Sequence, residues 1–96
     1  MKLSFHPEVK ADLRNQYEYY RDIDPELGAS FIEEYKKALV FVKSGPLVMR
    51  IFYKNDRRAP LKRFKSFAVV YEVLEDEIHI KAVADLRRRP YFWSTR

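Results

Sequence analysis

The sequence predicts an α+β domain in which an antiparallel pair of helices packs on one face of a small antiparallel sheet. Three observations support this fold class. Apolar residues recur every three or four positions up to residue 44, which is the period of a helix. Beyond residue 46 the period changes to two, which is the period of a strand. Two helices followed by strands are typical of α+β proteins, and residues 1–96 are enough for a single domain.

The first elements are a short strand and a helix. Residues 2–5, KLSF, alternate and are compatible with a strand. Pro7 is expected at the first helical position, where its missing N–H does no harm. The helix that follows should run for about four turns, because its apolar stripe continues at helical spacing through Val9, Leu13, Tyr17 and Tyr20.

The second helix has clearer boundaries. Asp24, Pro25 and Glu26 supply an N-cap, a proline in the first turn and an acid near the helix N-terminus. Residues 43–46, KSGP, should end the helix, with Gly45 in a left-handed conformation. The link between the helices is so short that they should form an antiparallel hairpin.

The second half of the chain predicts a three-stranded antiparallel meander over residues 59–64, 67–74 and 78–85. Pro60 fits the start of the first strand, where a missing donor does least harm. Residues 47–53 fit either a strand or an ordered loop, and Asn55 and Asp56 mark a turn. In the second strand, alternation places four residues on the face toward the helices: Phe67, Val69, Tyr71 and Val73. In the third strand, the residues on that face should be Ile78, Ile80, Ala82 and Ala84.

Composition excludes several functional classes. The absence of cysteine rules out disulfides and thiolate metal sites. The two histidines, His6 and His79, are far apart and have no carboxylates at ligand spacing, so neither a metal nor a cofactor is expected. Two glycines cannot build a phosphate-binding loop. The N-terminus lacks the apolar region of a signal peptide, and no stretch is long and apolar enough to span a membrane, so we expect a cytoplasmic protein.

The net charge of +5 is distributed unevenly. Residues 1–44 carry a net charge of −1, whereas residues 45–96 carry +6. The excess positive charge in the second half favours an acidic partner, either nucleic acid or an acidic protein segment. The alternative is a solvated basic surface that aids solubility.

The densest cluster of cations and large rings is residues 87–96, RRRPYFWSTR. Lys81 and one of Lys62 and Arg63 should lie on the sheet face away from the helices and converge with the arginines. Such a surface suits phosphates and unstacked bases, and it equally suits a protein interface. The alternative is that the rings dock on the core and leave the arginines solvated. We expect a mixture of the two, in which some rings dock and some arginines contact a partner. The candidate target-binding residues are Arg87, Arg88, Arg89, Tyr91 and Trp93.

Three segments of the sequence resemble the RelE/ParE superfamily of bacterial type II toxins: HPEVKADL…YYRDIDPELGASFIEEY, APLKRF…VVYEV and IHIKAVADLRRRPYFW. The most specific part is the motif A-V-x-x-x-R-R-x-P-x-x-W at residues 82–93. The tyrosine pair before the acid-proline helix start looks more like the ParE, or plasmid-stabilisation, branch than the RelE branch. The RelE/ParE-like fold that this implies agrees with the α+β prediction.

The resemblance implies two alternative activities. ParE-like members poison DNA gyrase and are not known as enzymes, whereas RelE-like members are ribosome-dependent mRNA endoribonucleases. RNA cleavage needs a base, an acid and cations on the phosphate. Ala68 and Trp93 stand about where the nucleases carry an arginine and a tyrosine, and these departures favour the gyrase-type toxin. If the chain is a nuclease, its candidate catalytic residues are Lys62, Arg63, Arg87 and Tyr91.

A toxin of this kind implies a cognate acidic antitoxin and a hetero-oligomer with it. The basic second half suits an acidic chain. One small sheet should leave part of the stripe on the second helix exposed, where an amphipathic antitoxin helix would bind. Two alternatives remain: the helices bury their stripes fully, or the chain is a non-toxic nucleic-acid- or protein-binding module. The candidate antitoxin-binding residues are Leu27, Phe31, Ile32, Tyr35 and Leu39.

Overall fold

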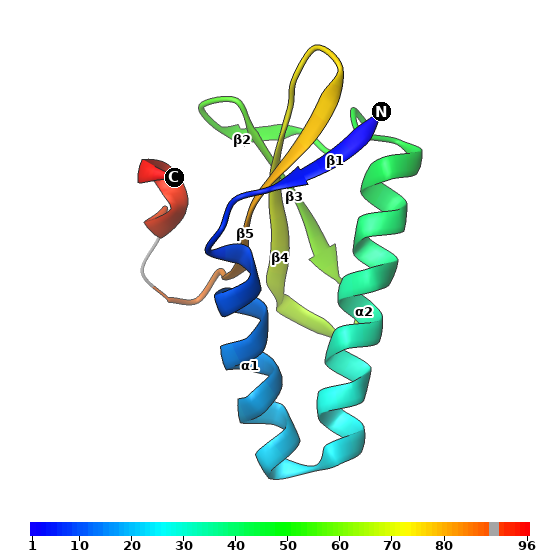
Figure 1. The fold of residues 1–96 in the computed structure, drawn as a ribbon, viewed down its shortest axis with the longest axis vertical. Coiled ribbons are helices and arrows are strands. Elements are labelled where there is room, and N and C mark those ends of the chain that lie inside the picture. Colours follow the sequence, from blue (N-terminus) through cyan, green and yellow to red (C-terminus); the bar gives the residue numbers. More distant parts are fainter. Residues whose placement is uncertain (89–90) are drawn as a thin grey trace.

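Two antiparallel helices lie against one face of a sheet in the computed structural model, which describes residues 1–88 and 91–96 (Figure 1). Helix α1 spans Val9–Ile23 and helix α2 spans Pro25–Ser44. The hairpin packs tightly near its tip, because a Cβ at Gly28 would lie 3.0 Å from the Cβ of Arg21. The predicted helical hairpin is therefore confirmed.

The observed ends of the two helices agree only in part with the ends predicted from the sequence. Asp24 caps α2, and its carboxylate accepts a 2.9 Å hydrogen bond from the backbone N–H of Glu26. Helix α1 begins at Val9 rather than Pro7, because the N–H of Val9 closes a turn on the carbonyl of His6. Gly45 has a φ of −148°, so the expected left-handed conformation is wrong. A Cβ at position 45 would lie 2.8 Å from the Cγ2 atom of Val48, and this close approach explains why glycine occupies the position.

The sheet has five strands in the order β1-β5-β4-β3-β2. The central meander of β3 (Asp56–Leu61), β4 (Phe64–Val73) and β5 (Glu77–Asp85) is antiparallel, as predicted. Strand β1 (Lys2–Phe5) pairs with β5 in parallel, which makes the sheet mixed. Residues 47–53 contribute a short edge strand, β2 (Ile51–Tyr53). The turn that precedes β3 lies at Lys54 and Asn55, and Asp56 is already in the strand.

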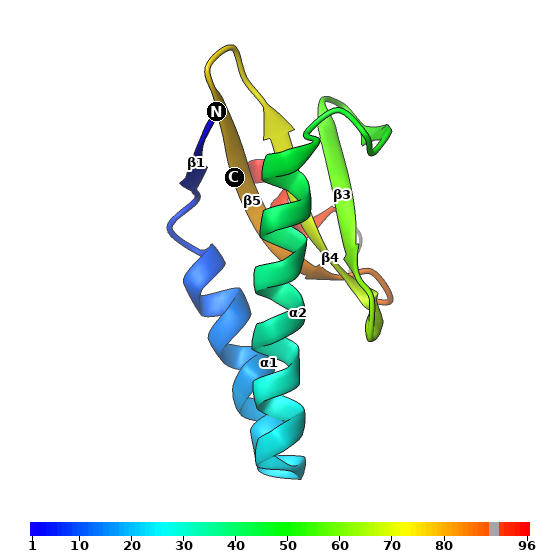
Figure 2. The same ribbon diagram turned by 90° about the vertical axis from the view of Figure 1, so that its right-hand side faces the viewer.

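The two faces of the sheet carry separate apolar clusters. Figure 2 shows α2 in front of the sheet and part of the C-terminal tail behind it. The larger cluster lies between the sheet and the helices and includes Phe31, Tyr35, Phe67 and Tyr71. The smaller cluster lies on the opposite face, which we call the open face. There the C-terminal tail covers the sheet with a short 3-10 helix, η1 (Phe92–Thr95). The open face is thus partly closed by the end of the chain.

A β-bulge in β5 changes which residues share a face. Val70 pairs with Ala82 while Tyr71 pairs with Ile80, so Lys81 is an extra residue in β5. Before the bulge, Ile78 and Ile80 pack in the helix-side cluster, as expected. After the bulge the prediction is wrong. Ala82 and Ala84 were expected on the same side as the isoleucines, but they belong to the open-face cluster.

Candidate target-binding surface

Two exposed arginines at the end of β5 are held by one shielded carboxylate. Arg87 donates hydrogen bonds to both oxygens of Asp85 from its Nε (3.1 Å) and its terminal nitrogen (3.2 Å). Nε of Arg88 lies 3.4 Å from Oδ2 of the same residue. The side chains of Arg87 and Arg88 are 69% and 78% exposed, whereas that of Asp85 is 9% exposed. Asp85 therefore fixes the direction of two cations that face solvent.

The charge state of this cluster is stable at neutral pH. Burial raises the pKa of the Asp85 carboxyl, but hydrogen bonds and charge from Arg87 lower it more, so its pKa lies below the ordinary value. Arg87 has its pKa raised, mainly by the hydrogen bond to Asp85. The Arg87 guanidinium consequently stays charged, and it faces solvent together with that of Arg88, where an anionic partner can reach both.

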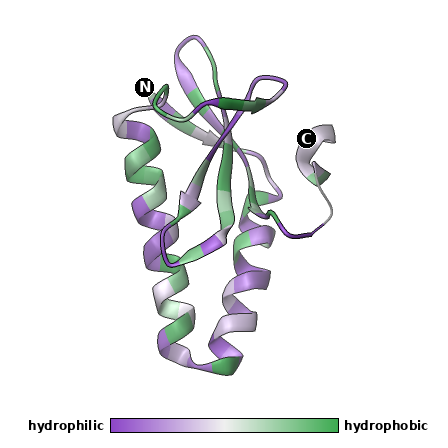
Figure 3. Ribbon diagram, turned by 180° about the vertical axis from the view of Figure 1, so that it is seen from behind, coloured by the Kyte–Doolittle hydropathy of each residue, from purple (hydrophilic) through white to green (hydrophobic). Residues whose placement is uncertain are grey.

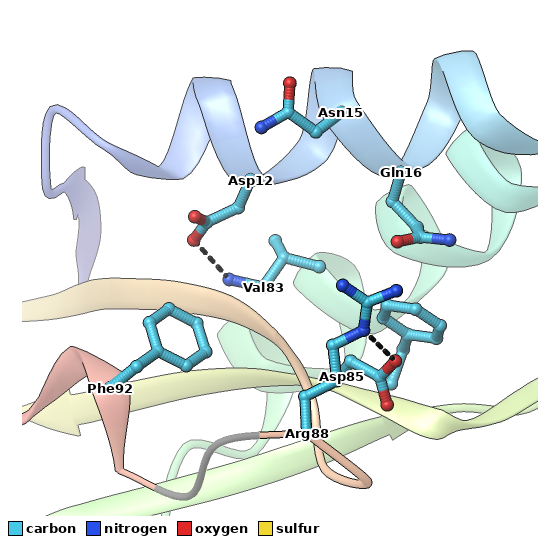
Figure 4. Close-up of a pocket in the computed structure, with 8 residues that line it drawn as sticks. Asp12, Asn15, Gln16, Val83, Asp85, Arg88 and Phe92 are labelled. Carbon is cyan, nitrogen blue, oxygen red and sulfur yellow. Dashed lines mark hydrogen bonds and ion pairs between the residues drawn. The ribbon is translucent and has the colours of Figure 1, made fainter.

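A hollow of about 320 Å³ lies between α1, β5 and the tail, beside Arg88 (Figure 4). The side chain of Arg88 extends from the end of β5 toward Gln16 on α1. Asp12 on α1 accepts a 3.1 Å hydrogen bond from the N–H of Val83 at the wall of this hollow. The surface near the arginines is therefore concave, and its wall mixes polar side chains from α1 and the end of β5 with apolar ones such as Phe67 and Phe92.

The tail is anchored on the open face by Trp93. The indole is 3% exposed, and its Nε1 donates a 3.0 Å hydrogen bond to Oδ2 of Asp56 on β3. The side chain of Asp56 is itself only 2% exposed, and its other oxygen lies 2.7 Å from Nζ of Lys81. Lys81 also lies 3.1 Å from Glu72. Trp93 thus closes a partly buried network with two carboxylates and one cation.

The Lys81 amine is fully committed to this network. Burial lowers its pKa, but the nearby carboxylates of Asp56 and Glu72, which accept from the amine and carry the opposite charge, outweigh burial, so the pKa lies above the ordinary value. A lysine that is charged and paired in this way cannot serve as a general base at neutral pH.

A second anchor holds the last residue of the tail. The guanidinium of Arg96 forms hydrogen bonds to both oxygens of Asp12, at 2.7 and 3.0 Å, and a third to the carbonyl of Lys81 at 2.9 Å. Strand β1 pairs with β5 only as far as Ile80. Asp12 and Arg96 therefore satisfy backbone groups of β5 along the edge that β1 leaves uncovered.

Tyr91 precedes both anchors in the tail and remains at the surface. Its ring stacks on Tyr53 with a centroid separation of 4.1 Å and an interplanar angle of 20°, and it is 42% exposed. Its φ of 58° is in the left-handed region, which is uncommon for a residue other than glycine. The docked tail holds Tyr91 in this conformation, beside the buried Trp93, whose ring centroid lies 5.8 Å from that of Tyr91.

The structure separates the predicted target-binding residues into three groups. Arg87, Arg88 and Tyr91 are exposed, as a contact surface requires. Arg89 lies outside the described residues. Trp93 is buried, so it supports this surface from below instead of contacting a partner directly. The mixture of docked rings and exposed arginines combines the two alternatives that the sequence left open.

The expected convergence of Lys62 and Arg63 with Lys81 is wrong. Both residues form the turn between β3 and β4, so they do not alternate across a strand. Arg63 donates a 3.2 Å hydrogen bond to Ser30 of α2, and Lys62 lines a groove beside α2. They therefore lie on the helix side of the sheet, away from Lys81 on the open face.

The stripe on α2 is largely buried. Phe31 is fully buried and Tyr35 is 8% exposed. The other three residues are partly buried against the same cluster: Leu27, Ile32 and Leu39. The alternative in which the helices bury their own stripes is thus the better description of this face.

Three aspartates that organise the surface were not found from the sequence. Asp85 could have been recognised, because it lies two residues before Arg87 at a strand end. Asp56 was interpreted as a turn residue, and Asp12 was not singled out. Their hydrogen-bond partners in the tail, Trp93 and Arg96, lie 37 and 84 positions away in the sequence, so no local pattern indicates them.

Two further classes of site were searched for in the described part of the chain. Residues 1–88 and 91–96 contain no group of three or more His, Cys, Asp or Glu side chains placed to hold a metal ion. Neither α1 nor α2 has an apolar stretch of the length needed to cross a membrane.

Comparison with known proteins identifies the family. The sequence model of the ParE toxin of the type II toxin–antitoxin system parDE matches residues 3–90. No curated protein matches the chain. A solved structure described as the chromosomal ParDE toxin–antitoxin system from P. aeruginosa has 22% identity and a TM-score of 0.70, with 90% of this chain and 96% of that chain covered, and it shows the same fold. Because the family match spans most of the sequence, the chain belongs to the ParE toxin family of type II toxin–antitoxin systems.

Proposed function

We propose that this toxin acts in the cytoplasm by inhibiting DNA gyrase and that a cognate antitoxin neutralises it. The observation that carries the proposal is the match to the ParE family over residues 3–90. ParE-like toxins, which the sequence also resembles most closely, poison gyrase. The basic second half of the chain, with a net charge of +6, suits a target that is itself bound to DNA.

The proposed contact surface is formed by Arg87, Arg88 and Tyr91. Each arginine presents a planar fork of donors that fits a carboxylate or a phosphate. Asp85 orients both forks in advance, which reduces the entropy lost when a partner binds. Tyr91 adds an exposed ring that is already held by Tyr53.

The nuclease alternative has less support. Arg63 is bonded to Ser30 on α2, Arg87 to Asp85, and Tyr91 is stacked on Tyr53, so each of these three candidates is already engaged by a different neighbour. Lys81 on the open face is paired with two carboxylates. A general base, a general acid and a phosphate cation do not meet at one point among the described residues.

A gyrase supercoiling assay with the purified chain tests the proposal. We expect inhibition by the wild type and loss of inhibition in the variant Arg87→Ala/Arg88→Ala, because the fork donors are removed. The matched control is Lys36→Ala/Lys43→Ala, which removes two exposed cations from α2 and should inhibit as the wild type does.

Expression in cells supplies the second half of the test. Induction should cause DNA damage and filamentation while protein synthesis continues at first. Rapid arrest of translation with mRNA cuts at codon-specific positions would instead establish the ribonuclease. Normal growth and normal supercoiling would indicate a binding module without toxicity.

A further inference from the structure

Two adjacent hollows lie where the open face meets the β2–β3 edge of the sheet. The first has a volume of about 470 Å³, and Arg50, Phe52 and Arg58 contribute to its wall. The second has a volume of about 220 Å³ and is lined by Arg58, Lys65 and Leu86 among others. Phe52 and Leu86 both pack against the open-face cluster, so the hollows belong to that face. Because Arg58 lines both, we treat them as one surface and call it the basic track.

The cations of the basic track are exposed and carry no compensating charge. In residues 1–88 and 91–96, no acid lines either hollow, and no carboxylate forms an ion pair with Arg50, Arg58 or Lys65. The guanidinium of Arg58 lies over the ring of Phe52, 4.7 Å from its centroid, which orients the group without neutralising it. The track therefore presents three cations to an anion, and the central one is oriented in advance.

The chain around the basic track is almost free of acids. Residues 45–71 contain seven lysines and arginines and a single acid, Asp56. The side chain of Asp56 is 2% exposed and is paired with Lys81, so it does not offset the charge at the surface. Mostly purple ribbon along β3 and through the turn to β4 marks this hydrophilic region (Figure 3). A concave surface with charge of one sign concentrates the electrostatic potential and attracts a polyanion.

We propose that the basic track binds the phosphate backbone of duplex DNA. This inference goes beyond the proposed function, because the track should bind DNA in the absence of gyrase. Each cation can contact a phosphate and release the counterions condensed there, which is the main source of sequence-independent affinity for DNA. Phosphates project from a duplex and can enter a depression whose walls carry the cations, whereas a flat lipid surface cannot.

The single ring of the basic track favours a duplex over a single strand. Proteins that bind single strands use aromatic side chains on which the bases stack. Among the described residues, Phe52 is the one aromatic side chain that lines the track, and Arg58 already lies over its face. The track therefore suits contacts to phosphates instead of bases, and binding should not depend on the DNA sequence.

The basic track is next to the candidate target-binding surface along the chain. Leu86, which lines the track, immediately precedes Arg87 and Arg88. DNA on the track would thus lie close to the residues that we propose contact gyrase. On the basis of the proposed function, the toxin should bind a gyrase–DNA complex more tightly than gyrase alone, because two linked contacts reinforce each other.

Fluorescence anisotropy with a short labelled DNA duplex and the purified chain tests the track. Between 50 mM and 200 mM salt, three phosphate contacts should weaken binding about 40-fold, at a slope of about −0.9 per contact. The variant Arg50→Gln/Arg58→Gln/Lys65→Gln should lose most of this salt dependence and bind about tenfold or more weakly at 50 mM salt. The matched control has the same net charge but removes three exposed cations from α1 and α2, and it should bind as the wild type does: Lys10→Gln/Arg14→Gln/Lys36→Gln.

The outcomes distinguish charge at the track from other causes of binding. Equal salt slopes in the two triple variants, with equal melting temperatures, would refute the track. The variant Arg50→Lys/Arg58→Lys keeps both charges and should bind nearly as the wild type does, so a loss of binding would also count against contacts made by charge. A single strand that bound as tightly as the duplex, or polyglutamate that displaced the duplex as well as unlabelled DNA does, would refute the assignment to duplex DNA.

The same measurements separate this inference from the proposed function. A chain that inhibits gyrase but binds no DNA on its own would refute the basic track and leave the proposed function standing. A chain that binds DNA through the track but does not inhibit gyrase would support the track and refute the proposed function.

Discussion

Removing a single hydrogen bond donor from the tail should loosen it measurably. Trp93→Phe keeps an aromatic ring over the open-face cluster but deletes the Nε1–H that bonds Asp56 at 3.0 Å. Asp56 is 2% exposed and cannot regain this bond from solvent. Hydrogen bonds to charged groups contribute about 1.5–3 kcal/mol, so the free energy of unfolding should fall by about 2 kcal/mol. For a domain of this size that corresponds to a melting temperature lower by about 8–16 °C.

Thermal and urea unfolding followed by circular dichroism measure this change. Ser94→Ala, in the same 3-10 helix but exposed, is the control and should change the free energy of unfolding by less than about 0.5 kcal/mol. The reasoning would be refuted if Trp93→Phe were as stable as Ser94→Ala. That result would mean that Asp56 is satisfied by Lys81 alone and that the tail is held by its rings.

Two further predictions concern the charged groups under the tail. Folding lowers the pKa of the Asp85 carboxyl. The stability that this ionised carboxyl contributes is therefore present above about pH 4 and is lost as the pH falls through the folded pKa. The difference in unfolding free energy between the wild type and Asp85→Asn should consequently shrink in acid titrations. An unchanged difference at pH 2.5 would contradict this. Lys81→Met leaves the buried carboxylate of Asp56 without its cation and should lower the free energy of unfolding by about 3 kcal/mol in urea denaturation. A variant of wild-type stability would show that the network contributes nothing.

Local signals in the sequence were sufficient to predict the two helices. The cap at Asp24 and the proline that follows it act within one turn of chain, so their effect does not depend on the rest of the fold. The alternation of Phe67, Val69 and Tyr71 likewise predicted their shared face, because the helix side of β4 is uniformly apolar.

Features that depend on pairing between distant segments could not be predicted. The bulge at Lys81 arises from the register between β4 and β5, and it reverses the side of the two alanines that follow. The burial of Trp93 depends on a carboxylate 37 positions away. Family resemblance supplied the overall topology, but it did not indicate which ring docks or that the stripe on α2 is already covered.

The parallel pairing of β1 with β5 also determines the order in which this chain can fold. Ser4 and His79, which share a 2.8 Å hydrogen bond across these strands, are 75 positions apart. The helical hairpin and the β3-β4-β5 meander involve neighbouring segments and close small loops, whereas β1 must wait for the last strand. During synthesis the first strand therefore has no partner until β5 has emerged. A nascent chain should remain incompletely folded until then, and completion of the sheet should be a late, slow step in refolding kinetics.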